Sequence, residues 1–429
     1  MNTSDVFKEF LGNLVIQNKE EISGRYKTIT KALNKKFWKN ESEILNSLKI
    51  GSYGRKTAVN GVSDLDMIFE LSDEDFKKYS ASDSNGQLKV LQDFKDAIMV
   101  SYPTTDIKVD RYVVVVNFTN YVVEVCPVFL QADNKYKFPD SYDGGKWKVT
   151  NPRPEINEIN DFDTNTNQNL KNLAKMTRAW KNKCGVKIGG LLVDTLCYEF
   201  LQNNEEHWET NYSSYDILVR DFFQFLKDYN KERKEWYAPG SNQKVYKKGS
   251  NFISKAKKAH ENIVEAISKQ NNDTVYTIWK KVFGYPFPYP KAIKEAATNY
   301  TNQEEYIEER YPIDIRYALS INCRVKQNGF QIALLKEMLE KLRKNKKLEF
   351  FIQNIDVQKP YQVLWKIKNE GQIAKDKNML RGQIVKDNGT EIRNENTNFE
   401  GAHYVECYII KNNVCVARDR IDVPIANLI

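Results

Sequence analysis

The feature that most constrains the fold is a pair of aspartates, Asp64 and Asp66, at the start of an apolar run that extends to Leu71. The run has the period-two pattern of a strand, and side chains two positions apart on a strand point to the same face. Both carboxylates therefore project from one face. Two hard oxygen ligands at this spacing suit Mg²⁺, which proteins bind through a few carboxylates, substrate phosphates and water.

A glycine turn precedes this strand and suits a triphosphate. Gly51 and Gly54 let the backbone turn tightly and bring its N–H groups, with the Ser52 hydroxyl, against phosphate oxygens. A third acid, Glu124, stands in the apolar stretch 121–130, where a charge is costly unless it is paired or bound to metal. The alternative for Glu124 is a sheet-edge residue that meets a Lys or Arg. Two-metal phosphoryl chemistry is helped by such a third carboxylate.

The hydrophobic pattern divides the chain into three regions. Helical spacing covers residues 11–48, short strands follow at 65–71, 107–118 and 121–130, and 141–163 is expected to be a loop. Helices are predicted at 170–180, 191–201, 217–229, 256–267 and 274–283. Period-two strands are predicted at 361–368, 379–386, 403–411 and 414–423.

These patterns predict an α+β protein. We expect a mixed-sheet core with N-terminal helices at 1–165, a helical lobe completing the cleft at 166–300, a connecting region at 301–349, and a small all-β domain at 350–429. The 429 residues are enough for two or three domains of roughly 150 residues each.

Composition excludes several classes of protein. No stretch approaches the roughly 20 apolar residues of a membrane-spanning helix, and the first residues lack the pattern of a signal peptide. Six cysteines without a Cys-x-x-Cys pair, and only three histidines, disfavour a structural zinc site. We therefore expect a cytoplasmic protein with reduced cysteines and no membrane partner.

The motifs together resemble a known family. Gly51-Ser52-Tyr53-Gly54-Arg55, Ser63-Asp64-Leu65-Asp66 and a third acid before a proline look like the polymerase-β-type nucleotidyltransferases. With residues 144–153, 176–181 and 279–288, the pattern resembles the bacterial cGAS/DncV-like nucleotidyltransferases (CD-NTases). The C-terminal segments 360–371, 380–384 and 401–409 are similar to the adenylyl/guanylyl cyclase and SMODS C-terminal sensor domain, AGS-C.

The resemblance implies a metal-dependent enzyme that joins nucleoside triphosphates into a cyclic dinucleotide or trinucleotide messenger and releases pyrophosphate. ATP is the expected substrate, with GTP or others as further candidates. The resemblance also implies a role in antiphage defence of the CBASS type, in which a downstream effector reads the product. The family pattern gives Ser52 to the donor triphosphate and assigns Asp64, Asp66 and Glu124 to two Mg²⁺ or Mn²⁺ ions. The family usually has Asp at the position of Glu124.

The resemblance also places a basic residue near the donor phosphates. Arg178 matches this position, and Lys175 and Lys181 lie about one helical turn on either side of it as alternatives.

A basic region adds to the net charge of +8. Residues 231–260 interleave aromatic side chains with lysines that include Lys244, Lys247 and Lys248, so the region is either a cationic lid over the cleft or a surface for an activating RNA. We rank the lid first. A different class of function remains an alternative: a weakly active or inactive nucleotide-binding sensor that binds RNA or a phage ligand and signals through partners.

Two smaller groups of residues have competing interpretations. One group could form either a metal site or part of the hydrophobic core, and its apolar neighbours favour the core: Cys407, Cys415 and His403. The other group is expected either to stack on a nucleotide base or to pack at the seam between two subdomains: Tyr285, Phe287 and Tyr289.

Overall fold

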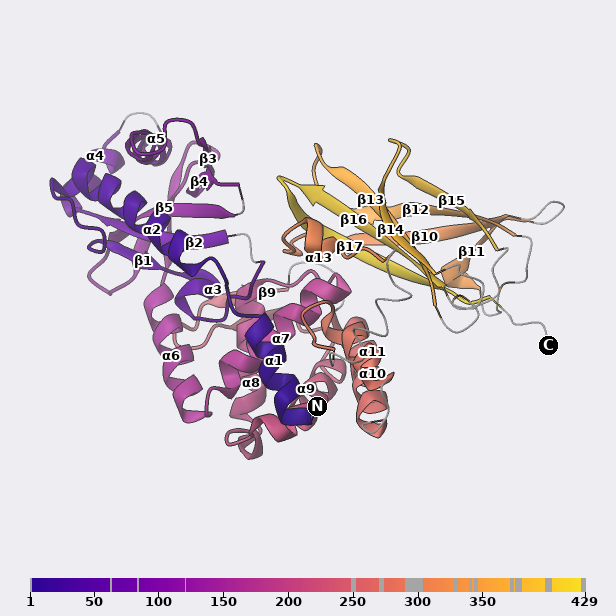
Figure 1. Ribbon diagram of the computed structural model, residues 1–429. Helices are drawn as coiled ribbons and strands as arrows, with labels where there is room; N and C mark the ends of the chain where they lie inside the picture. The colour runs from indigo at the N-terminus through magenta and orange to yellow at the C-terminus, as the bar shows by residue number, and fades with distance from the viewer. Residues whose placement is uncertain are drawn as a thin grey trace.

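A computed structural model gives the structure of the protein (Figure 1). It describes residues 2–61, 64–82, 85–119, 121–247, 252–269, 274–289, 304–326, 331–338, 342, 346–370, 374, 380–397 and 403–425. In Figure 1, a core of sheet and helices and a helical lobe lie next to each other, and a β-rich domain lies beside both.

The core is a mixed sheet in the order β1-β2-β5-β4-β3, which β6 and β7 extend from β5. Its strands are β1 (Ser47–Lys49), β2 (Asp64–Leu71), β3 (Asp106–Asp110), β4 (Val113–Asn117), β5 (Val122–Leu130), β6 (Tyr136–Asp140) and β7 (Lys146–Thr150). Only β2 and β5 pair in parallel; the other described pairs are antiparallel.

One face of this sheet is apolar and the other carries the acids. Leu65, Met67 and Phe69 of β2 are buried in a cluster with residues of α2 (Lys19–Leu33) and α5 (Gly86–Met99). A short helix, α4 (Asp73–Ser80), packs against α5. Because side chains alternate along a strand, Asp64 and Asp66 point to the opposite face. The period-two prediction for this strand agrees with the structure.

The structure differs from three of the predictions for the N-terminal region. Residues 34–38 form a π-helical turn after α2, and β1 lies where the helical prediction continued to residue 48. The predicted strand 107–118 is a hairpin of β3 and β4. The expected loop 141–163 instead contains the strand β7 and most of the helix α6 (Pro152–Asn165). The helix can begin at Pro152 because the missing N–H of a proline costs nothing in the first turn.

The helical lobe is built from α1 (Thr3–Asn13), α6, α7 (Asn169–Cys184), α8 (Gly190–Gln202), α9 (Tyr215–Lys227), α10 (Phe252–Ser268) and α11 (Thr274–Phe283). Its hydrophobic cluster includes Trp180 and residues of all seven helices. The first helix, α1, therefore packs with the lobe rather than with the core, as Figure 1 also shows.

Aromatic packing bears on the two interpretations of the segment 285–289, base stacking or a subdomain seam. Phe287 is fully buried against Phe7, Phe10 and Trp279. Tyr289 contacts Tyr276. In this structure the segment packs within the lobe, which agrees with the seam interpretation.

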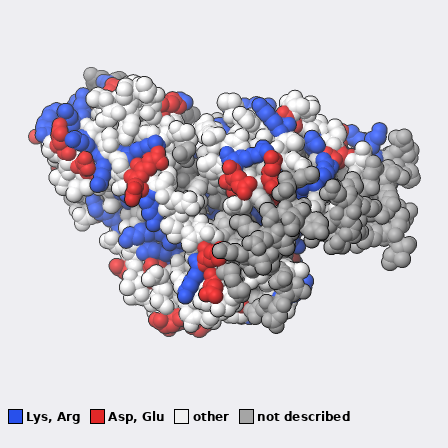
Figure 2. Space-filling view, in the orientation of Figure 1, with Lys and Arg blue, Asp and Glu red and all other residues white. Residues whose placement is uncertain are grey.

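Within the basic region, residues 235–246 form an anchored hairpin. Strands β8 (Glu235–Tyr237) and β9 (Lys244–Tyr246) pair, and Trp236 and Val245 are buried in the core of the lobe. Trp236 is only 1% exposed, so its side chain anchors the hairpin to the core of the lobe. Lys and Arg side chains lie among Asp and Glu on the face in Figure 2, rather than forming one basic surface there.

The C-terminal domain is a sandwich of two four-stranded sheets. One has the order β11-β10-β12-β15, with β10 (Leu319–Lys326), β11 (Ala333–Leu334), β12 (Lys347–Ile355) and β15 (Ile392–Asn396). The other has the order β14-β13-β16-β17, with β13 (Gln362–Asn369), β14 (Arg381–Lys386), β16 (His403–Lys411) and β17 (Val414–Val423). Since β10 is a strand of the first sheet, the stretch 301–349 is not simply a connection.

The apolar clusters that hold the two cysteines decide the metal hypothesis for this domain. Cys407 lies inside the sandwich, whereas Cys415 belongs to a separate apolar cluster outside it. Among the residues that the structure describes, no group of three His, Cys, Asp or Glu side chains is placed to hold a metal ion here. Both cysteines are core residues. No helix in the described part of the chain is long and apolar enough to span a membrane.

Candidate nucleotidyltransferase site

The three predicted acids lie on neighbouring strands. In the parallel pair of β2 and β5, Asp66 is the register partner of Glu124 and Asp64 is the partner of Val122. Burial, with a further contribution from Asp314, raises the pKa of Asp66 to about 6, although Arg55 opposes this rise. Burial and the Asp66 charge raise the pKa of Glu124 to about 7. The two carboxylates are thus close enough to repel each other, and no Lys or Arg is paired with Glu124 among the described residues.

The glycine turn lies directly against Asp66. It forms the short helix α3 (Gly51–Gly54), and the Ile50 N–H donates to the carbonyl oxygen of Asp66 at 2.9 Å. Gly51 has a φ of +61°, and a Cβ at this position would overlap the Asp66 carboxylate. Burial and the Asp66 charge raise the pKa of Tyr53 to about 12. Only glycine allows this approach of the backbone to the acid.

The donors fit a divalent cation by their chemistry. Carboxylate oxygens are the ligands that Mg²⁺ prefers, and a cation would relieve the repulsion between Asp66 and Glu124. In the described part of the chain, no three acidic side chains converge as a closed metal cluster. One of the three carboxylates, that of Asp64, is paired with an arginine instead.

That arginine is Arg316, which follows the end of the helical lobe and precedes β10. Its guanidinium forms an ion pair with Asp64, and its Nε donates to Asp314 at 2.5 Å. Asp314 in turn lies 3.6 Å from the Lys181 ammonium. Sequence reasoning missed Asp314 and Arg316, because no motif surrounds them.

A second buried charge network joins the glycine turn to the lobe. Asp194 of α8 accepts from Arg55 at 2.7 Å, from Thr57 at 3.1 Å, and from both terminal nitrogens of Arg178 at 2.7 and 2.9 Å. Burial raises the pKa of Asp194, but Arg178 and Arg55 more than offset this effect and hold the pKa below its usual value. Asp194 was also missed, although an acid in the apolar helix 191–201 is the signal that identified Glu124.

These contacts place the three basic candidates differently. The structure shows Arg178 in the buried pair with Asp194 and Lys181 beside Asp314, so in this structure both are engaged by carboxylates rather than presented to a phosphate. Lys175 forms no ion pair with a described residue, and burial lowers its pKa.

Two lysines of the basic region contact side chains within the lobe. Lys244 pairs with Glu235 across the hairpin at 3.1 Å, and the Lys247 ammonium lies 6.0 Å from the centre of the Phe252 ring. Lys248 lies outside the described residues. Farther along, Lys255 and Lys258 of α10 pair with Asp419 and Asp422 of β17.

A mixed sheet with paired acids, a glycine turn against one of them and a helical lobe beside it define a nucleotidyltransferase of the polymerase-β-like fold. Residues 1–163 match the model of the Second Messenger Oligonucleotide or Dinucleotide Synthetase domain. Residues 301–426 match the Adenylyl/Guanylyl and SMODS C-terminal sensor domain. The chain belongs to the CD-NTases, a family of cyclic nucleotide synthases, and carries a C-terminal AGS-C sensor domain.

Individual relatives agree with this assignment. The chain is 25% identical over 255 residues to a probable cyclic nucleotide synthase of Bacillus cereus, which covers 55% of this chain and 72% of the relative. It is 22% identical over 254 residues to a cyclic AMP-AMP-AMP synthase of an Acinetobacter species, and the match covers 57% of this chain and 74% of the relative. The fold matches CdnC of E. coli MS115-1, solved in a complex with HORMA-deltaN, with a TM-score of 0.51, 15% identity, and coverage of 66% of this chain and 98% of CdnC.

Proposed function

We propose that this chain binds two nucleoside triphosphates between the core sheet and the helical lobe and joins them, in successive rounds, into a cyclic dinucleotide or trinucleotide. The observation that carries the proposal is the register of Asp66 beside Glu124, with the backbone of Gly51 against Asp66. The reaction would be attack of a ribose hydroxyl on an α-phosphate, with pyrophosphate as the leaving group.

Each site residue has a proposed role. Asp64, Asp66 and Glu124 would hold two Mg²⁺ or Mn²⁺ ions. Such ions, when bound, lower the pKa of the attacking hydroxyl and neutralise the triphosphate. The Ser52 hydroxyl and the Gly51–Gly54 turn would hold the donor phosphates, because a compact glycine turn brings the backbone close to an anion.

Lys175 is the basic residue that we propose for phosphate contact. Arg178 and Lys181 are engaged by Asp194 and Asp314, whereas Lys175, on the same helix, forms no ion pair with a described residue. Burial lowers its pKa, and the charge of Asp163 only partly opposes this effect. A half-buried cation of this kind is suited to a polyanionic ligand.

The proposed setting is a cytoplasmic antiphage response, in which a separate effector reads the cyclic product. One relative is named for a cyclic AMP-AMP-AMP product, so ATP is the first nucleotide to test. Activation by an RNA or a phage ligand is a further part of this proposal.

The test is to incubate the full chain with the four ribonucleoside triphosphates and Mg²⁺ or Mn²⁺, treat the mixture with phosphatase, and analyse resistant products by mass spectrometry. Glu124→Gln should abolish the cyclic product. The matched control is Glu70→Gln, a carboxylate on the same face of β2 but four residues beyond Asp66, which should retain it. Equal product from Glu124→Gln and the wild type would refute the assigned site.

A further inference from the structure

The ion pair between Arg316 and Asp64 joins strand β2 of the core to the segment that precedes β10, and this segment is held by the C-terminal domain. The segment 312–316 runs along β17: the Cys415 N–H donates to the Pro312 carbonyl at 2.9 Å, and the N–H groups of Asp314 and Arg316 donate to the carbonyls of Cys415 and Val416 at 3.0 Å. The segment is therefore held by main-chain hydrogen bonds to the sensor domain.

Alternation along this segment directs its charges toward the core. Ile313 and Ile315 are buried in an apolar cluster with residues of the sensor sheet. Asp314 and Arg316 alternate with them and so project from the other side. There Arg316 meets Asp64, and the Asp314 charge contributes to the raised pKa of Asp66 and of Glu124. The sensor thus supplies one cation and one anion to the site.

The segment is also fixed to the helical lobe. Asn182 of α7 donates to the Ile313 carbonyl at 3.1 Å, and Lys181 lies 3.6 Å from Asp314. The next residue of α7, Lys183, lies 3.4 Å from Glu406 of β16.

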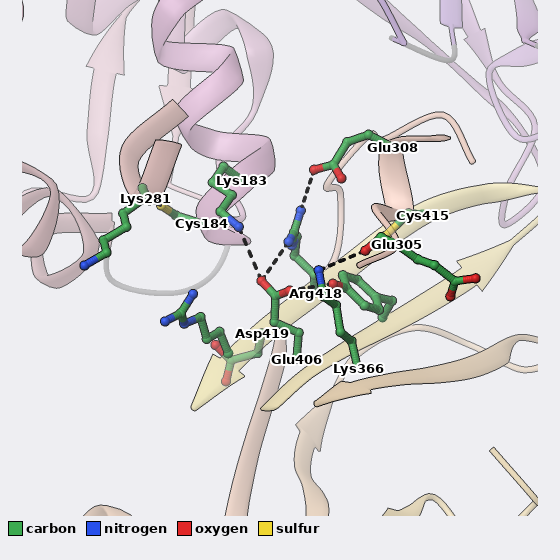
Figure 3. A network of polar contacts seen from close by, with 12 residues as sticks. Lys183, Cys184, Lys281, Glu305, Glu308, Lys366, Glu406, Cys415, Arg418 and Asp419 are labelled. Carbon is green, nitrogen blue, oxygen red and sulfur yellow. Dashed lines mark hydrogen bonds and ion pairs between the residues drawn. The ribbon is translucent and has the colours of Figure 1, made fainter. Parts of the chain in front are cut away.

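Glu406 is the centre of a buried network between lobe and sensor. It accepts from Arg418 of β17 at 2.9 Å, and Arg418 donates to Glu308 of α13 (Ile307–Arg310) at 3.0 Å. Figure 3 shows Lys183 and Arg418 both pointing to the Glu406 carboxylate, with Glu308 beyond Arg418. The same strand, β17, therefore carries both this network and the segment that presents Arg316.

We propose that residues 312–316, the inhibitory strap, hold the synthase in a resting state by placing Arg316 on Asp64, and that undocking of the sensor domain releases Asp64 for its metal. This inference rests on the proposed function. A guanidinium and a divalent cation compete for one carboxylate because both are bound by its charge. The strap has to leave Asp64 before all three acids are available.

Metal affinity tests the strap without relying on catalysis. Mn²⁺ binding to the full chain is measured by isothermal titration calorimetry in the absence of nucleotide, for the wild type and for Arg316→Ala. The dissociation constant should fall about tenfold in the variant, the lower end of the effect of a hydrogen bond to a charged group. Arg316→Met is measured in parallel, because it keeps most of the apolar stem in place.

The matched control is Arg324→Ala. Arg324 has nearly the same side-chain exposure as Arg316, 38% against 36%, and also pairs with a carboxylate, but its partner Glu349 belongs to the sensor domain. Its Mn²⁺ affinity should equal that of the wild type. Unchanged Mn²⁺ affinity in both Arg316 variants overturns the inference, provided that their melting curves match that of the control.

Pyrophosphate release is the second measurement. The rate should rise about tenfold in Arg316→Ala at low Mn²⁺; a lower rate overturns the inference, because it would show that Arg316 assists substrate binding instead. If no variant releases pyrophosphate, the proposed function fails, whereas the Mn²⁺ titration still decides whether Arg316 competes with metal at Asp64.

Discussion

Replacing Asp194 with asparagine tests how the glycine turn is fixed to the helical lobe. The Asp194 carboxylate is fully buried and accepts four hydrogen bonds, from Arg55, Thr57 and two nitrogens of Arg178. An amide keeps one acceptor oxygen and turns two N–H donors toward the guanidinium groups. Arg178 then loses its counter-charge, and Arg55 keeps only the carboxylate of Glu155, at 3.9 Å.

Removing one partner of a buried ion pair costs about 3–5 kcal/mol. At about 2–4 °C per kcal/mol for domains of about 150–250 residues, the unfolding transition that includes the lobe should fall by about 6 °C or more. Differential scanning calorimetry of Asp194→Asn measures this shift. The rate of pyrophosphate release should fall too, since Arg55 directly follows the glycine turn.

The control is Asp221→Asn. Asp221 pairs with Arg220 at 2.7 Å and lies 3.2 Å from Nε2 of His207. The Asp221 and Arg220 side chains are 32% and 39% exposed, so we expect the substitution to cost about 1 kcal/mol. If the Asp194 variant melts within 2 °C of the Asp221 variant, the buried network does not stabilise the junction and the reasoning is wrong.

Three further changes have expected outcomes. Gly51→Ala should lower pyrophosphate release at least about tenfold, with strain of about 1–3 kcal/mol, whereas Gly144→Ala, also at positive φ but with open space around it, should leave activity unchanged. Trp236→Ala should lower the free energy of unfolding, measured by calorimetry, by about 3–5 kcal/mol if the Trp236 side chain is part of the core. Tyr237→Ala, at a half-exposed neighbour, should change it by less than about 0.5 kcal/mol. Burial would raise the pKa of Glu406, but its cationic partners hold this pKa well below 4.5. The ionised carboxylate therefore stabilises the fold above pH 4.5, and this stabilisation is lost as the pH falls further. Below pH 4.5, the melting temperature of Glu406→Gln should fall less steeply with pH than that of the wild type.

The acids of the site could be predicted because their signals are local. Asp64 and Asp66 share a face by strand parity, and Glu124 is an uncompensated charge in an apolar strand. The structure places Glu124 in register with Asp66, which the sequence pattern alone does not determine. The two strands pair in parallel and lie more than 50 residues apart in the sequence, so no tight turn between them fixes their register.

The remaining contacts of the site depend on distant parts of the chain. The basic residue Arg178 was assigned from a motif position, but the choice between a phosphate and a carboxylate depends on Asp194 from the next helix. Arg316 reaches Asp64 through the placement of a whole domain, so neither residue shows the pairing in its local sequence. The missed helix α6 is a simpler case, because its two prolines were interpreted as loop residues although proline is favoured in the first turn.

The chain order of these contacts has a consequence for synthesis of the protein. The parallel pairing of β2 with β5 requires only the residues up to Leu130, whereas the strap follows about 190 residues after Glu124. At about 5–20 residues per second, a ribosome needs roughly 10–40 s to make that stretch, long enough for an N-terminal unit to fold first. A newly made molecule therefore has time to assemble its acids before its own Arg316 has been translated.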